Sequence, residues 1–184
     1  MRCWSRRSVL AAGLGLAGCA ALDRSRLDRL YGGLARPADQ PPAILIPGAF
    51  GSTLRDRATG RELWPVSDSQ LLLGNYRGLE LSIDPVTLAP DLHDEAYAVL
   101  RTGLGRDFYG HLIATLRQLG GYDRCRVGDA SMTGPPCDLY VYVYDFRLDN
   151  VRAAAGLGAL IERIRDEHHD PRLRVDVIAH SNGG

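Results

Sequence analysis

Three short apolar runs, separated by longer polar and amphipathic stretches, constrain the fold of this chain more than any other feature. They are AILIPG at 43–48, DLYVYVYDF at 138–146 and RVDVIAHS at 174–181. Each has the length and the apolar, β-branched or aromatic content of a strand, and continuous runs of this kind are typical of strands buried on both faces of a parallel sheet. We therefore expect three central strands.

Two amphipathic patterns connect these runs and predict helices. The first follows Asp107, a suitable N-cap, stops at Gly120-Gly121 and repeats apolar residues at helical spacing: Phe108, Leu112, Leu116 and Leu119. The second follows the cap candidates Asp149 and Asn150, ends before Pro171 and has one apolar face: Leu157, Leu160, Ile161 and Ile164. Strand, helix, strand, helix, strand predicts an α/β fold, a mostly parallel sheet with right-handed crossovers and helices on both faces.

The other stretches are less regular. Residues 51–101 mix Gly, Pro, Asp and short apolar runs, which favours irregular structure with a short helix near 67–73 and a small hairpin. Residues 20–41 are polar and Arg-rich and end in Pro-Pro, which is typical of a tether. A hydrophobic content of 45% suits a single core, so we expect one domain over 42–184.

Residues 1–19 are typical of an export signal, because three arginines precede the apolar run 9–17 and small residues follow it. Arg6-Arg7 lies in a segment that resembles a twin-arginine signal, and LAGC at 16–19 resembles the lipobox of bacterial lipoproteins. The sequence thus predicts an exported protein of the bacterial periplasm or cell surface, anchored to a membrane through a lipid on Cys19. An ordinary cleaved signal without lipidation is the alternative.

The charge of the chain gives no indication of a nucleic-acid partner. Its 22 basic and 22 acidic residues balance, and the basic residues, all Arg, form no cluster. Cleavage of the signal would remove three arginines and leave a net acidic chain. A lipid anchor, rather than attraction to anionic headgroups, would therefore hold the protein at a membrane.

A serine motif closes the third apolar run. Ala179-His180-Ser181-Asn182-Gly183 fits the frame G-x-S-x-G with Ala at the first position. In that frame small residues let the chain turn sharply from strand to helix and expose the serine. We interpret Ser181 as a nucleophile, and a simple turn after a buried strand is the alternative.

The turn after the first run, Pro47 to Gly51, can supply a matching oxyanion hole. Acyl transfer through a serine needs donors aimed at the oxygen that becomes negative, and one such donor lowers the barrier by about 3 kcal/mol. The candidates are the backbone N–H groups of Ala49 and of Asn182, the residue after the serine. A plain tight turn is the alternative.

Four segments, taken in order, resemble the lecithin:cholesterol acyltransferase family of α/β-hydrolases: AILIPGAFGSTLRD, GRELWP, YVYDFRLDN and VDVIAHSNGG. The resemblance covers 42–184, with Phe146 where the family has Trp. It implies Ser181 as nucleophile and the amides of Ala49 and Asn182 as oxyanion donors. It also implies fatty acyl esters as substrates, water or an alcohol as acceptor, and no metal or other cofactor.

The same resemblance assigns Asp145 and Arg147 to structure, where they would orient the loop after the second run; contact with substrate is the alternative. His168, His169 and Asp170 together invite a metal site, but at a helix end a solvated cluster that complements the helix dipole is favoured.

In the α/β-hydrolase fold the acidic and histidine partners of the serine follow it in the chain, whereas only Asn182, Gly183 and Gly184 follow Ser181. We therefore expect 1–184 to be the N-terminal part of a serine esterase or acyltransferase, inactive alone. The runner-up is a non-catalytic surface lipoprotein that uses a hydrolase-like half-fold for binding. A third possibility is a peptidase or small-ester hydrolase on the same fold.

Cys125 and Cys137 are the pair left for a disulfide once the signal is removed and Cys19 is acylated. A bridge would close the loop CRVGDASMTGPPC and contribute about 3 kcal/mol to the free energy of unfolding; two buried thiols are the alternative. Under denaturing conditions, we expect alkylation to add mass at both cysteines only after reduction. Equal alkylation with and without reductant would exclude the bridge.

Overall fold

The computed structural model describes residues 37, 39–67, 74, 76–103, 105–122, 125–127 and 136–184, with the backbone alone for 125–127. The predicted export signal with Cys19, most of the predicted tether and residues 68–73 of the predicted short helix lie outside the described residues. The fold below therefore concerns the region predicted to be the folded domain.

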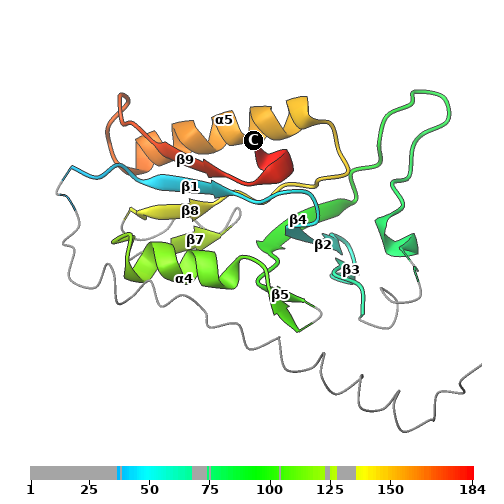
Figure 1. The fold of residues 1–184 in the computed structure, drawn as a ribbon. Coiled ribbons are helices and arrows are strands. Elements are labelled where there is room, and N and C mark those ends of the chain that lie inside the picture. The colour runs from blue at the N-terminus through cyan, green and yellow to red at the C-terminus, as the bar shows by residue number, and fades with distance from the viewer. Residues whose placement is uncertain are drawn as a thin grey trace, which may run out of the picture. The chain divides into compact units, whose positions relative to one another are not determined.

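A four-stranded parallel sheet forms the centre of this region (Figure 1). Its strands, in spatial order, are β7 (Cys125–Val127), β8 (Leu139–Val141), β1 (Ala43–Ile46) and β9 (Asp176–Ala179). All three pairings are parallel, which confirms the three predicted strands and their direction. The expected burial on both faces is wrong for β9, which lies at the edge of the described sheet and is exposed at three of its four residues. β8 is shorter than expected because the chain leaves the sheet beyond Val141 on its way to the next helix. The sequence pattern does not predict β7.

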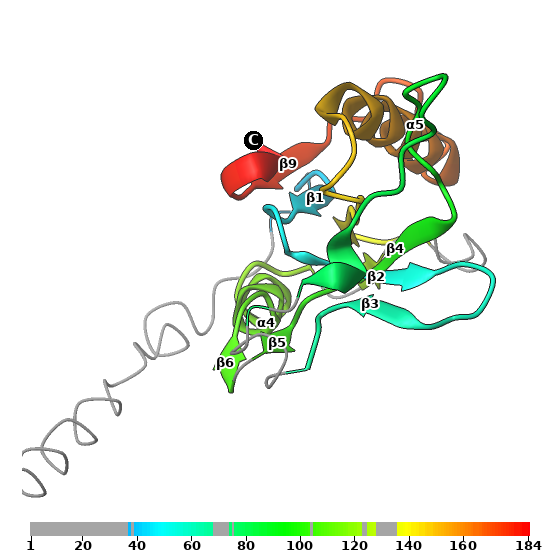
Figure 2. The same ribbon diagram turned by 90° about the vertical axis from the view of Figure 1, so that its right-hand side faces the viewer.

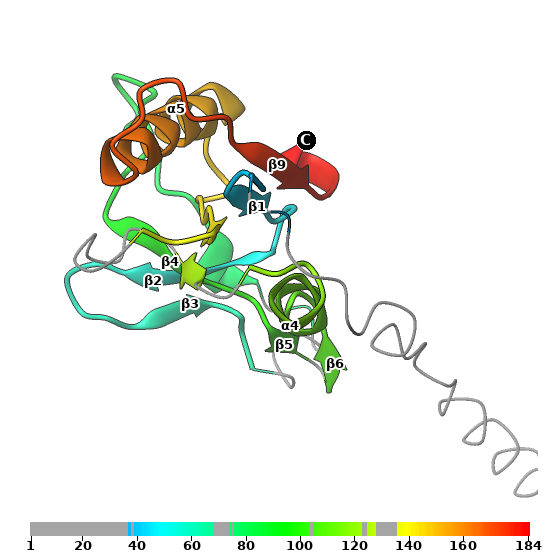
Figure 3. The same cartoon turned by 90° about the vertical axis from the view of Figure 1, so that its left-hand side faces the viewer.

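Two helices cover the two faces of this sheet, as Figures 2 and 3 show. They are α4 (Gly110–Gln118) and α5 (Asn150–Glu167). In β1, Leu45 belongs to the same buried cluster as Ile113 of α4, whereas Ile44 belongs to the cluster that contains Ile164 of α5. Burial on both faces explains the continuous apolar sequence of β1.

The path of the chain accounts for this arrangement. β1 leads through the antiparallel sheet and α4 to β7, two places along the parallel sheet, and β8 leads through α5 back across β1 to β9 on the other side. Right-handed crossovers that run in opposite directions along a sheet lie on opposite faces. The carboxyl ends of the parallel strands β1 and β9 consequently meet at one edge of the sheet.

The start of α5 agrees with the prediction from the sequence. Asp149 is its N-cap, and the Asp149 carboxylate accepts the N–H of Val151 at 2.7 Å. Pro171 follows the end of the helix, as expected. The apolar face is confirmed as well, since Leu160 and Ile164 are buried.

The start of α4 differs from the prediction. Tyr109, rather than Asp107, is the N-cap, and Phe108 lies before the helix and is 51% exposed. The reason is a small hairpin of β5 (Thr102–Gly103) and β6 (Arg106–Asp107), which holds Asp107 in extended backbone. From there the Asp107 carboxylate still accepts the N–H of His111 at 2.8 Å.

A second, antiparallel sheet has the order β3 (Glu62–Trp64), β2 (Ser52–Asp56) and β4 (Asp94–Val99). Two short 3₁₀ helices complete the described elements, η2 (Arg77–Leu79) and η3 (Ser181–Gly183). Only a small hairpin was expected here, because these strands are rich in polar residues. Their cross-strand contacts are polar too: Arg55 pairs with Glu95 at 2.6 Å and lies over the ring of Tyr97.

A buried ion network joins the segment after β8 to the antiparallel sheet. Arg147 donates to both carboxylate oxygens of Asp145, at 2.9 and 2.6 Å, and to Asp94 of β4 at 2.8 Å. The side chains of Arg147 and Asp145 are each 7% exposed. The hydrogen bonds to Asp145, and secondly those to Asp94, raise the pKa of Arg147. This geometry agrees with the structural role expected for both residues.

We predict that Arg147→Met destabilises the protein strongly, because it leaves the carboxylates of Asp145 and Asp94 without their cation. Removing one partner of a buried ion pair costs about 3–5 kcal/mol. The matched control is Arg55→Met, which removes a more exposed pair with Glu95 and should cost about 1 kcal/mol or less. Urea-induced unfolding measures both, and equal losses would contradict a special role for the buried network.

Candidate active site

The two segments predicted to form the active site lie side by side. The parallel register of β1 and β9 ends with Ile46 opposite Ala179, and the N–H of His180 donates to the carbonyl of Ile46 at 3.1 Å. Directly beyond this pair, β1 continues into the turn 47–51 and β9 into η3. The sheet thus brings together two stretches that are about 130 residues apart in the sequence.

Ser181 has the backbone conformation that the serine frame requires. Its φ is +54°, in the left-handed region that residues other than glycine rarely adopt. His180 before it is still extended, so the chain turns at the serine, and Ser181 is exposed. Strained backbone at a reactive serine on a turn from strand to helix is typical of nucleophilic serines in α/β-hydrolases.

Two glycines permit the close approach of the two segments. A Cβ on Gly48 would lie 2.9 Å from the Cβ of Ser181 and 3.1 Å from the carbonyl oxygen of His180. A Cβ on Gly183 would lie 2.8 Å from Ile46 Cγ2 and from the carbonyl oxygens of Ile46 and Pro47. The small residue two positions after Ser181 is therefore required by contact with β1.

The turn after β1 is tight and leaves backbone donors open. The N–H of Gly51 donates to the carbonyl of Gly48 at 2.9 Å, and Phe50 has a φ of +63°. Among the described residues, no acceptor bonds the N–H of Ala49 or of Asn182. Both residues are exposed, and both amides are thus without a bonded acceptor at the surface of the described region.

Aromatic contacts hold Phe50 in its unusual conformation. The indole N–H of Trp64 donates to the Phe50 carbonyl at 2.9 Å. The Phe50 ring lies 5.3 Å from that of Trp64 and 4.8 Å from that of Phe146. Phe146, which stands where the resembling family has Trp, thus packs against the turn that carries Ala49.

Two tyrosines at the site were not predicted. The hydroxyl of Tyr109 accepts the N–H of Gly48 at 2.8 Å and lies 2.7 Å from Nδ1 of His180. The hydroxyl of Tyr144 donates to the Pro47 carbonyl at 3.1 Å. It also accepts the side-chain amide of Asn182 at 3.1 Å. No periodicity distinguishes them from core aromatics. Tyr144 lies within the quoted segment YVYDFRLDN, which is its one sequence signal, whereas Tyr109 lies in none of the quoted segments.

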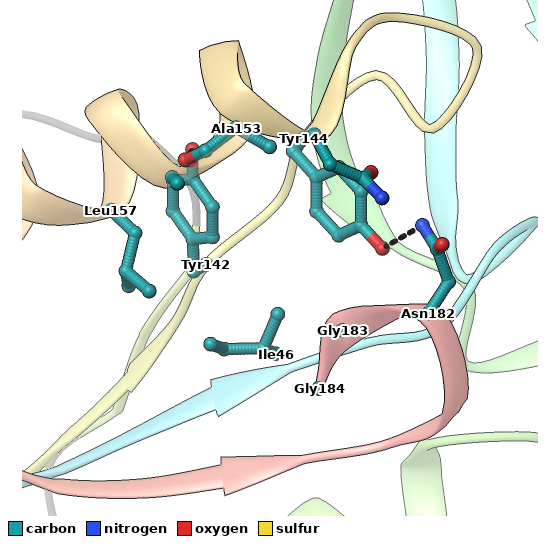
Figure 4. A pocket seen from close by; sticks show the side chains of 10 residues that line it. Ile46, Tyr142, Tyr144, Ala153, Leu157, Asn182, Gly183 and Gly184 are labelled. Carbon is teal, nitrogen blue, oxygen red and sulfur yellow. Dashed lines mark hydrogen bonds between the residues drawn. The ribbon is translucent and has the colours of Figure 1, made fainter.

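An open hollow of about 280 Å³ lies between η3, β1 and the first turns of α5. Figure 4 shows Asn182 and Tyr144 bonded at one side of the hollow, and Ile46 and Leu157 on other sides. Its lining is mainly apolar side chains and glycine backbone. The hollow thus opens beside the residue that follows Ser181.

None of the described histidines is hydrogen-bonded to Ser181. The ring of His180 bonds Tyr109, while His93 and His111 contact Asp91 and Asp107 at 3.3 and 3.1 Å. His168 Nε2 lies 3.1 Å from the Cys137 carbonyl. The structure therefore does not bring a general base to the serine within the described region.

The end of α5 forms a separate polar cluster. The Tyr140 hydroxyl donates to Glu167 at 2.9 Å, accepts the N–H of Cys137 at 3.2 Å and lies 3.4 Å from His168 Nε2. Burial, and secondly the bond to Glu167, raise the pKa of Tyr140. Within the described part of the chain, no three His, Cys, Asp or Glu side chains gather as metal ligands would.

The described residues do not include Cys19 or the side chain of Cys125. Lipidation and the disulfide therefore stay predictions. Cys137 is buried.

Comparison of the chain with protein-family models, with curated proteins and with solved structures found no match. Within the part of the chain that the structure describes, no helix has the length and apolar character needed to cross a membrane.

We predict that Gly183→Ala lowers the free energy of unfolding by about 1–3 kcal/mol, because its methyl group would overlap β1. The matched control is Gly158→Ala in α5, where nothing lies within 4 Å of an added Cβ. There alanine should stabilise the helix by about 0.5–1 kcal/mol. Urea unfolding followed by circular dichroism compares the two, and a neutral Gly183→Ala would show that the approach to β1 is not tight.

Proposed function

We propose that this chain carries the nucleophile and the oxyanion hole of a serine-dependent acyl ester hydrolase or O-acyltransferase of the α/β-hydrolase type. One observation carries the proposal. A serine with φ +54° at the end of β9 touches a turn after β1, and each segment offers a backbone N–H without an acceptor among the described residues. Serine exposure and paired amide donors are what acyl transfer requires.

In the proposed mechanism, Ser181 Oγ attacks the ester carbonyl while its proton passes to a base. The carbonyl oxygen becomes negative and accepts hydrogen bonds from the amides of Ala49 and Asn182. Collapse expels the alcohol, which takes a proton, and leaves an acyl group on Ser181. Water or a second alcohol then attacks the acyl-enzyme, and Oγ regains its proton.

In this proposal the base would be a histidine, as in other enzymes with this elbow. None of the described histidines bonds the serine. Residues 1–184 alone should therefore turn over esters very slowly.

The proposed substrates are fatty acyl esters. The protein itself is proposed to be exported through its N-terminal signal and anchored to a membrane by a lipid. The resemblance of four sequence segments to the lecithin:cholesterol acyltransferase family supports the class. The partly exposed ring of Phe50, at 50%, adds an apolar surface on the turn that carries Ala49. No metal or other cofactor is part of the proposal.

A second candidate is a non-catalytic lipoprotein that uses the same half-fold for binding. The observation that favours it is the absence of a base bonded to Ser181 among the described residues. In that case the open amides at the strand ends would bind an oxygen of a ligand without reaction.

The two candidates differ in the reactivity of the serine. On the complete gene product we expect a fluorophosphonate probe to label the wild type but not Ser181→Ala. The matched control is Ser82→Ala, which should be labelled normally, since Ser82 lies on the exposed segment before β4. Intact mass spectrometry measures the adduct. Equal labelling of wild type and Ser181→Ala would refute the nucleophile, and an unlabelled wild type would favour the binding module.

A further inference from the structure

Few groups hold the turn after β1 against the serine segment. The ladder between β1 and β9 ends with the bond from the His180 N–H to the Ile46 carbonyl. Beyond it, within the described residues, no backbone hydrogen bond joins the turn 47–51 to Ser181 or the residues after it. The two proposed donors, Ala49 and Asn182, therefore sit on segments that the sheet itself no longer connects.

Two buried tyrosine hydroxyls span this gap. Tyr109 is 6% exposed and comes from the start of α4; Tyr144 is 7% exposed and comes from the segment after β8. Each hydroxyl contacts one residue of the turn and one residue beside Ser181. The two bridges are made from the two faces of the sheet.

Each of the two tyrosine hydroxyls is hydrogen-bonded on both sides of the gap. A phenol has one proton to donate and can also accept. Tyr109 accepts from the Gly48 N–H and shares a second hydrogen bond of 2.7 Å with Nδ1 of His180, in which the tautomer of the ring decides which group donates. Tyr144 accepts from the Asn182 amide and donates to the Pro47 carbonyl. Figure 4 shows the second bridge from Asn182 to Tyr144.

We propose that Tyr109 and Tyr144 are positioning residues that fix the distance between the oxyanion donors Ala49 and Asn182. The inference rests on the proposed acyl transfer and goes beyond it, because neither hydroxyl takes part in the bond changes. A shift of about 1 Å in catalytic geometry can cost up to about 100-fold in rate. Tyrosines that hold two donors in register therefore act on the transition state, where the oxyanion exists, and not on substrate binding.

The test compares Tyr→Phe variants of the complete gene product with p-nitrophenyl butyrate as substrate. For Tyr109→Phe and Tyr144→Phe we expect kcat to fall by about tenfold or more with KM nearly unchanged. The matched control is Tyr140→Phe, which removes a buried hydroxyl that donates to Glu167 of α5 at 2.9 Å and contacts neither the turn 47–51 nor the serine segment. It should lose similar stability and keep its kcat.

The outcomes separate this inference from the proposed function. If the fluorophosphonate probe labels the wild type at Ser181 but Tyr109→Phe and Tyr144→Phe keep the wild-type kcat, the positioning role is wrong and the acyl transfer stands. A kcat loss in Tyr140→Phe as large as in the other two variants would also overturn it, because general loosening would then explain the effect. If the fluorophosphonate probe does not label the wild type, both the proposed acyl transfer and the positioning role are wrong. Should Tyr109→Phe not fold, Tyr144→Phe decides alone.

Discussion

The parallel pairing of β1 with β9 is the interaction on which the candidate site depends. β1 is buried on both faces, between the clusters of α4 and α5, so its position is fixed by packing rather than by the turn that follows it. β9 takes its direction from β1 alone among the described strands. Because parallel strands end at the same edge, this one pairing places Ser181 beside Gly48.

Strained backbone occurs on both sides of that edge. Phe50 and Ser181 are two of the four described residues other than glycine with positive φ, and each lies within five residues of the end of β1 or β9. Such conformations persist only where the surroundings enforce them. Here the surroundings are the aromatic contacts of Phe50 and the close packing of Gly183 on β1.

The sequence predicts those parts of the fold that have continuous apolar runs or a distinct cap. β1, β9 and α5 follow from apolar runs and from Asp149, although β9 is mostly exposed. Ser181 follows from a motif with a steric reason. The sequence does not predict β7, which is only three residues long. It does not predict the antiparallel sheet either, because cross-strand pairs such as Arg55 with Glu95 leave no periodicity in the sequence. The roles of Tyr109 and Tyr144 are not predicted, because nothing in the sequence distinguishes a tyrosine with a bridging hydroxyl from any other core aromatic residue.

The two tyrosine bridges also tie the site to the integrity of both helical layers. Tyr109 caps α4, and Tyr144 lies in the segment that leads into α5. On their proposed role, a partly unfolded chain with either helix undocked from the sheet would keep its serine and its parallel strands but lose the alignment of its amide donors. Ester chemistry would then be restricted to the fully folded state, so that activity reports cooperative folding rather than the mere presence of the motif.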